Sequence, residues 1–256
     1  MRIELATAHG DAGRPNEDYV SVALPASGQG GALVLLDGVT PPEDGGGCAH
    51  GVTWFTARLG GALLELSGSQ RDMPLAACLS AAIERTAEKH QDTCDLSHVR
   101  TPQATVVAVR WDADRVEHLV LSDSVLLVEA PDGTVTPVLD DRLDRLRAAG
   151  RLVAPLRNAE DGFFTAAADP GVARRAVTGT LPRAEVRAVA ALTDGAARWV
   201  EVFGAGDWTR CLDLLRGAGP RELIDEVRAA EAADPLGLAH PRDKAHDDAA
   251  AVFAEL

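Results

Sequence analysis

The chain has 256 residues, of which 46% are hydrophobic and 25% are charged. This is the composition of a globular protein with enough apolar material for a large core, so disorder is excluded as an overall description. The formal net charge of −14 argues against nucleic acid and anionic membranes as partners, because Lys and Arg supply most of the binding to phosphate-rich surfaces.

The N-terminal part of the chain predicts strands followed by helices. Residues 3–8 and 19–24 show strand patterns, and we interpret the two as a hairpin. Residues 31–36 form a short, wholly apolar run that is typical of a buried strand. Residues 52–67 and 73–90 have apolar positions three and four apart, which predicts two amphipathic helices.

The middle of the chain predicts a meander of four antiparallel strands, followed by a helix at 140–149. The four strand ranges are 105–111, 116–121, 125–130 and 134–139. Residues 150–182 have weak periodicity with scattered Gly and Pro, and we interpret them as a variable, flap-like segment that faces the substrate.

The C-terminal part predicts strand 187–193, helices 208–215 and 220–233, and strand 249–256. Strands and helices therefore come in groups and do not alternate, which indicates the α+β class. No linker-like stretch divides the chain, so we expect a single domain over residues 1–256.

Cysteine usage and hydropathy predict where the protein works. Its four cysteines form no C-x-x-C pair, and the chain shows no signal segment at its start, so we expect a reducing, cytoplasmic location. No apolar run approaches the roughly 18 residues that a membrane-spanning helix needs. The sequence leaves the oligomeric state open. The cysteines are Cys48, Cys78, Cys94 and Cys211.

Aspartates recur at the ends of the apolar strands: Asp18, Asp37, Asp194 and Asp247. Strand ends can converge in space, and Mg²⁺ and Mn²⁺ prefer oxygen ligands. A glycine after an aspartate, as at Gly38, lets a backbone carbonyl approach the same ion. An Asp-Gly pair is also a common turn sequence, so one pair alone does not establish a ligand.

Taken in order, these motifs resemble the type-2C family of metal-dependent protein phosphatases over nearly the whole chain. No single motif is specific, but their order and spacing are. The stretches that carry the resemblance are Arg14 to Asp18 (RPNED), Leu33 to Gly38 (LVLLDG), Ala104-Thr105, Leu121 to Ser124 (LSDS), Leu192 to Gly195 (LTDG) and Asp247-Asp248.

The resemblance implies a fold and a metal site. The fold is a four-layer αββα sandwich in which helix pairs flank two antiparallel sheets. At one end it implies two Mg²⁺ or Mn²⁺ ions, with Asp37 bridging both and the Gly38 carbonyl on one of them. Asp194 and Asp247 would ligate the other ion, and Asp18 would hold a water bound to the metals.

The resemblance also implies an activity. The ions would activate a bridging water for in-line attack on phosphorus, without a phosphoenzyme, in a phosphoserine or phosphothreonine protein phosphatase. Arg14 would clamp the phosphate with its planar fork. Asp123 matches a position associated with a third ion, and a capped turn is an equally good interpretation of it.

Two other functions stay open. One is the same chemistry on a small phosphorylated metabolite, which the unusual segments 39–50 and 150–182 suggest. The other is a degenerate phosphatase that binds a phosphorylated or unphosphorylated partner without turnover. Retention of all four metal positions argues against the second.

The chain departs from the family pattern close to the expected site. Residues 37–42 read DGVTPP where bacterial relatives have DGxGGH, and glycines 45–47, Cys48 and His50 follow. His50 could act as a general acid, but a surface or helix-start role is favoured. Cys48 with His50 suggests a soft-metal or nucleophilic site, which is disfavoured because no other Cys or His has ligand spacing nearby. We interpret His90 as a surface or helix-end residue. The remaining departures are Ser122 for Gly, Asp248 for Asn and Ala250 for Thr.

Overall fold

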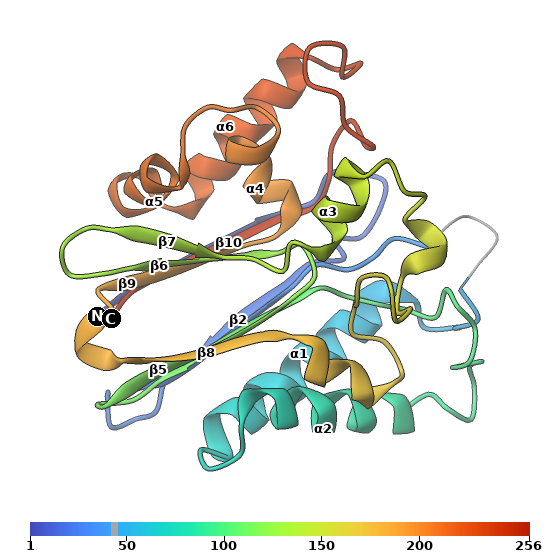
Figure 1. Cartoon of the computed structure of the whole chain (residues 1–256), viewed down its shortest axis with the longest axis horizontal. Coiled ribbons are helices and arrows are strands. Elements are labelled where there is room, and N and C mark those ends of the chain that lie inside the picture. Colours follow the sequence, from blue (N-terminus) through green and yellow to red (C-terminus); the bar gives the residue numbers. More distant parts are fainter. Residues whose placement is uncertain (42–45) are drawn as a thin grey trace.

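The computed structural model describes residues 1–41 and 46–256 and contains two five-stranded sheets (Figure 1). One sheet has the strand order β1-β10-β9-β6-β7, and the other has the order β2-β3-β4-β5-β8. Every neighbouring pair is antiparallel. The strands are β1 (Arg2–Ala8), β2 (Tyr19–Ala23), β3 (Gly31–Leu36), β4 (Val106–Trp111), β5 (Arg115–Leu121), β6 (Val125–Glu129), β7 (Val135–Val138), β8 (Val177–Pro182), β9 (Ala188–Leu192) and β10 (Ala249–Glu255).

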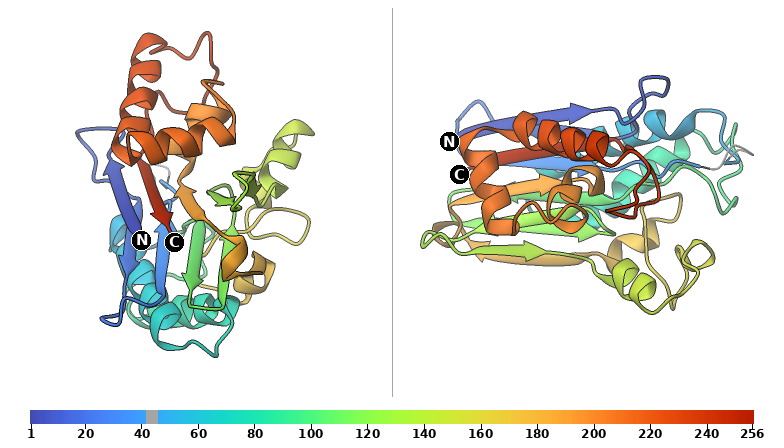
Figure 2. Two further views of the ribbon diagram at one scale, coloured as in Figure 1. Left: turned by 90° about the vertical axis from the view of Figure 1, so that its left-hand side faces the viewer. Right: turned by 90° about the horizontal axis from the view of Figure 1, so that it is seen from above.

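Helices cover the outer face of each sheet, and the two sheets pack against each other (Figures 1 and 2). Helices α1 and α2 lie on the β3 sheet, while α4, α5 and α6 lie on the β9 sheet. The predicted αββα sandwich is therefore confirmed, with α4 as an addition to the expected helix pair. The α-helices are α1 (Gly51–Ser69), α2 (Leu75–Glu88), α3 (Arg142–Ala148), α4 (Asp194–Glu201), α5 (Trp208–Gly217) and α6 (Pro220–Ala233).

The central strands are wholly apolar because both of their faces are covered. In β3, Leu33 and Leu35 point into the core between the sheets, and Val34 and Leu36 point towards α1 and α2. All six residues of the strand are buried. The continuous apolar run that predicted a buried strand thus reflects burial on two sides.

Two topological predictions were wrong. Strands β1 and β2 do not form a hairpin, since β1 pairs with β10 and β2 pairs with β3 in the other sheet. The meander of four strands is also interrupted, because the chain crosses from one sheet to the other between β5 and β6. Strand pairing is a long-range property that alternation along the chain does not specify.

The segment at 150–182 is more ordered than its weak periodicity suggests. It contains two short 3₁₀ helices, at Ala154–Leu156 and Pro170–Arg175, and ends in strand β8, which pairs with β5. The predicted loop after β3 includes Pro42 and Gly45, and both lie outside the described residues. In the parts of the chain that the structure describes, no helix is long and apolar enough to cross a membrane.

Candidate metal centre

Strand register brings the predicted aspartates together at one end of the sandwich. The residue after Asp18 pairs with the residue before Asp37 across β2 and β3, so these two carboxylates are neighbours. Antiparallel pairing of β9 with β10 brings Asp194, the first residue of α4 and two residues after β9, close to Asp247, which lies two residues before β10. Asp123 lies where the chain passes from β5 to β6. We call these five residues the carboxylate centre.

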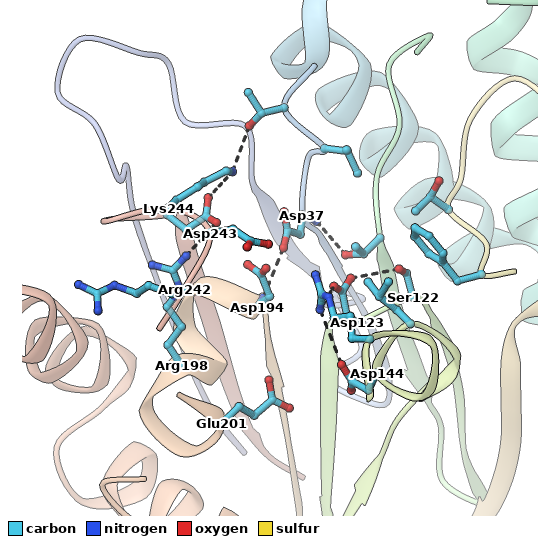
Figure 3. Close-up of a pocket in the computed structure, with 18 of the residues that line it drawn as sticks. Asp37, Ser122, Asp123, Asp144, Asp194, Arg198, Glu201, Arg242, Asp243 and Lys244 are labelled. Atoms are coloured by element: carbon cyan, nitrogen blue, oxygen red, sulfur yellow. Dashed lines mark hydrogen bonds and ion pairs between the residues drawn. The ribbon is translucent and has the colours of Figure 1, made fainter. Parts of the chain in front are cut away.

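The centre opens into a cavity of about 470 Å³ (Figure 3). Asp37, Asp123, Asp194 and Asp247 line it together with Gly38. The backbone N–H of Asp194 donates to Oδ2 of Asp37 at 3.4 Å, which fixes the two acidic residues side by side. Four carboxylates and a strand-end glycine therefore face one solvent-accessible space.

Asp18 does not line this cavity but lies near Asp194 and Asp247, and only one of its two carboxylate oxygens has a hydrogen-bond partner among the described residues. Its Oδ2 accepts a hydrogen bond from the hydroxyl of Thr193 at 3.0 Å, and the same hydroxyl accepts from the Ala250 N–H at 2.8 Å. The other oxygen, Oδ1, is buried and has no hydrogen-bond partner among the described residues. A buried, unpartnered carboxylate oxygen is costly unless a cation or water satisfies it.

Burial and mutual repulsion raise the pKa of three of these carboxyl groups. Burial, followed by the charges of neighbouring aspartates, raises the pKa of Asp37 and of Asp18 well above the usual range. Burial and the charges of Asp123 and Asp247 raise the pKa of Asp194 to about 6. Such a set of oxygen donors fits hard divalent cations, whose charge would remove the repulsion.

Glycines let the backbone pack closely around the centre. A Cβ atom on Gly38 would lie 2.5 Å from the Glu17 carbonyl oxygen and 2.5 Å from a methyl group of Val52. One on Gly195 would lie 1.9 Å from the carbonyl oxygen of Asp248. Glycine is therefore required here for close approach, which an Asp-Gly pair in an open turn does not need.

Two cations already hold Asp247. Nη2 of Arg198 contacts Oδ2 at 3.1 Å, and Nζ of Lys244 contacts Oδ1 at 2.7 Å. Arg198 is nearly buried and also pairs with Glu231 at 2.6 Å, so it fixes the carboxylate. The Lys244 side chain is 45% exposed, and its ammonium supplies the positive charge that a bound metal ion would bring to Asp247.

Ser122 and Asp248, two of the departures from the family pattern, both take part in hydrogen bonds to backbone N–H groups. Ser122 has a φ of 69°, a conformation that favours glycine, and its N–H donates to the buried Asp140 at 2.9 Å. The Asp248 carboxylate accepts hydrogen bonds from the backbone N–H groups of Gly10 at 2.8 Å and Glu17 at 2.7 Å. The Asp140 carboxylate therefore holds the backbone at Ser122, and Asp248 holds the backbone at Gly10 and Glu17, next to the centre.

A family model supplies the observation that decides the classification. The model described as protein phosphatase 2C matches residues 6–216. The chain belongs to the protein phosphatase 2C family. A comparison with curated proteins gave no match.

Solved structures of bacterial phosphatases share the fold of this family member. Serine/threonine phosphatase Stp1 from Staphylococcus aureus aligns with a TM-score of 0.62 at 13% identity, over 99% of this chain and 94% of its own. PstP/Ppp from Mycobacterium tuberculosis aligns with a TM-score of 0.59 at 18% identity, over 100% of this chain and 98% of its own. The catalytic domain of PstP in complex with two manganese ions aligns with a TM-score of 0.58 at 19% identity, over 99% of this chain and 97% of its own.

Arg14, which was predicted to contact the phosphate, and His50, for which a surface or helix-start role was favoured, both lie outside the cavity. Arg14 lies in an adjoining hollow that it shares with Thr40, Lys244 and Asp247. His50 does not line the cavity, and its Nδ1 lies 3.3 Å from the sulfur of Cys94.

Residues that sequence reasoning passed over also contribute to the centre. The LTDG motif contains Thr193, but the motif alone gave this residue no role. Arg198 belongs to helix α4, which the sequence did not predict. Arg157, in the flap-like segment, lines the cavity, and its buried Nε has no hydrogen-bond partner among the described residues. Lys244 stands three residues before Asp247, a spacing that could have signalled their ion pair.

Proposed function

We propose that this protein is an active Mg²⁺- or Mn²⁺-dependent phosphomonoesterase, with phosphoserine or phosphothreonine in proteins as its substrate class. The observation that carries the proposal is the convergence of four aspartates on one cavity, with Asp18 next to them. The pKa values of Asp18, Asp37 and Asp194 are raised, and the buried Oδ1 of Asp18 has no hydrogen-bond partner among the described residues. A binding module would have no use for so unfavourable a group of carboxylates. The match to the phosphatase family gives independent support.

In this proposal the predicted ligands hold two divalent ions, and Asp123 is available for a third. When bound, the ions lower the pKa of a water molecule and neutralise charge on the phosphate oxygens. Asp37 and Gly38 line the cavity after strand β3, and Asp194 and Asp247 line it next to the ends of β9 and β10. Asp18 orients water, because its Oδ1 is free to accept a hydrogen bond.

Arginines around the cavity supply the phosphate contact. Arg157 faces the cavity with an unpartnered Nε, and Arg14 faces the adjoining hollow. Both side chains have the planar fork that suits phosphate oxygens. We propose Arg157 as the nearer contact and keep Arg14 as a second one for a larger substrate. The cytoplasmic location expected from the cysteines remains part of the proposal.

Hydrolysis of p-nitrophenyl phosphate with and without Mn²⁺ tests the proposal. We expect metal-dependent turnover, and we expect Asp37→Asn and Asp194→Asn each to reduce it on the order of 10³-fold, as the loss of several kcal/mol of charge stabilisation requires. Asp92→Asn removes the same charge at an exposed position and should keep full activity. Full activity in Asp37→Asn would contradict the proposal.

A substrate panel then separates the protein phosphatase from the metabolite phosphatase. Phosphoserine and phosphothreonine peptides should have the higher kcat/KM if the substrate is a protein. A preference for small phosphorylated metabolites would keep the chemistry and change the substrate class. Absence of turnover on every substrate, in protein that still binds Mn²⁺, would favour a binding module.

A further inference from the structure

A second group of metal-binding side chains lies outside the carboxylate centre. Cys48, His50, His90 and Cys94 each offer a sulfur or nitrogen atom, and these four atoms lie within 4.8 Å of one another. None of the four residues lines the cavity of the carboxylate centre. We call them the Cys/His cluster.

The fold creates this cluster from two segments that are distant in the sequence. Cys48 and His50 precede α1, and His90 and Cys94 follow α2. Helices α1 and α2 pack side by side on the same sheet, which brings the start of the first near the end of the second (Figure 1). The sequence interpretation that no further ligand lies near Cys48 was therefore wrong, because it considered spacing along the chain only.

The sulfur–nitrogen distances within the cluster are close to the edges of a tetrahedron around one ion, and the two sulfurs are somewhat closer together than such an edge. Zinc–ligand bonds of about 2.3 Å to sulfur and 2.0–2.1 Å to nitrogen give edges of about 3.8 Å between sulfurs and 3.5 Å between sulfur and nitrogen. The two sulfurs are 3.2 Å apart. Nδ1 of His90 lies 3.4 Å from the Cys48 sulfur, and Nδ1 of His50 lies 3.3 Å from that of Cys94 and 3.8 Å from that of Cys48.

We propose that the Cys/His cluster is a structural zinc site. Two thiolates and two imidazoles in a tetrahedral arrangement are a donor set that zinc favours and that Mg²⁺ does not. The site joins the segment before α1 to the turn after α2, and it is independent of the phosphatase chemistry. With four protein ligands it leaves no open position for a substrate.

The surroundings of the four ligands support the proposal. The backbone N–H groups of Ala49 and His50 each point at a sulfur, at 3.4 Å from Cys94 and from Cys48 respectively. Such N–H groups stabilise metal-bound thiolates.

The rings of His50 and His90 are both directed at the cysteines of the cluster. His50 occupies the N-cap position of α1 but makes no side-chain capping bond, since its ring is directed at the cysteines and stacks on Trp54 with ring centroids 4.4 Å apart. His90 is 2% exposed, and its only hydrogen-bonded ring nitrogen among the described residues faces Cys48. A disulfide between the two cysteines would use neither ring.

Cobalt substitution is the sharpest test, because thiolate ligands give Co²⁺ intense charge-transfer absorption in the near ultraviolet and oxygen ligands do not. Reduced, metal-stripped full-length protein would receive Co²⁺ in the presence of excess Mg²⁺, which occupies the carboxylate centre. We expect one equivalent of Co²⁺ to produce the thiolate bands and tetrahedral visible bands. One equivalent of Zn²⁺ should abolish them and raise the thermal midpoint.

Matched variants make the outcome specific. Cys94→Ser should lose the thiolate bands of Cys94, and His50→Ala, at an exposed position that does not threaten folding, should weaken Co²⁺ binding at least about tenfold. Cys211→Ser changes a buried cysteine outside the cluster and should keep the bands. Asp37→Asn should keep them as well, which separates this proposal from the phosphatase proposal. Wild-type protein without thiolate bands, or a thiol count that reveals a disulfide between Cys48 and Cys94, would overturn it.

Discussion

The carboxylate centre and the Cys/His cluster are built in opposite ways. The first consists of oxygen ligands at strand ends, where burial and mutual repulsion oppose the charged state of Asp18 and Asp37. The second consists of sulfur and nitrogen ligands on a loop and a helix end, where N–H groups and neighbouring side chains favour the thiolate of Cys94. The carboxylate centre therefore lowers the stability of the folded chain, as functional sites often do. The Cys/His cluster has the features of a structural site that joins two segments of the chain.

The largest effect is expected from the backbone that supports the carboxylate centre. Gly195→Ala would place a Cβ atom 1.9 Å from the carbonyl oxygen of Asp248, and backbone on both sides leaves little room to move. We expect a loss of about 3 kcal/mol, at the upper end for overpacking, which corresponds to roughly 10 °C in the thermal midpoint. Thermal and urea unfolding would measure it.

Gly61→Ala is the matched control for this substitution. Gly61 lies in α1, and a Cβ there would meet no atom within 4 Å. Because alanine is the better helix former, this variant should be up to about 1 kcal/mol more stable. Equal midpoints for the two alanine variants would show that the centre is less tightly packed than its geometry indicates.

The contrast also explains which parts of the molecule the sequence could predict. The apolar run of β3 followed by Asp37 indicated both a buried strand and a ligand at its end, and strand register then brought the aspartates together. The Cys/His cluster left no such signal, since His90 and Cys94 approach Cys48 only through the packing of α1 on α2. Alternation likewise could not reveal that β1 and β2 belong to different sheets.

A second, smaller effect tests the energetic cost of the carboxylate centre. In metal-free protein at neutral pH, Asp37→Asn removes a carboxyl group whose ionised form is disfavoured by burial and by neighbouring aspartates. Relief of that penalty should raise the free energy of unfolding by an amount within the usual range for a single substitution, on the order of 1–3 kcal/mol. The variant should therefore unfold at a higher temperature in EDTA, although it loses activity.

Two controls sharpen this result. Asp92→Asn removes the same charge from an exposed surface position and should leave the midpoint nearly unchanged. Cys94→Ser should not raise the midpoint in EDTA, because its thiolate is favoured by its surroundings. If Asp37→Asn were no more stable than Asp92→Asn, the centre would carry no strain and the proposed difference between the two regions would fail.

The smallest effect is a pH dependence that belongs to the carboxylate centre alone. Asp194 has a usual pKa of 3.8 and a raised value of about 6 in the folded chain. The folded metal-free protein therefore binds more protons than the unfolded chain between these values, and its stability falls as the pH rises through this window. The raised pKa values of Asp18 and Asp37 extend the fall above pH 6. Mg²⁺ must displace those protons, so the stabilisation it gives should grow with pH.

Mg²⁺ is the suitable probe because thiolates and imidazoles bind it poorly. We expect its effect on the thermal midpoint to be small at pH 5 and to increase through pH 7, at up to about 1.4 kcal/mol per pH unit for each proton displaced. His50→Ala should follow the same curve as the wild type, since it leaves the carboxylate centre intact. A stabilisation by Mg²⁺ that is independent of pH across this range would mean that the aspartates bind the ion without losing protons, and the raised pKa values would then not describe the folded protein.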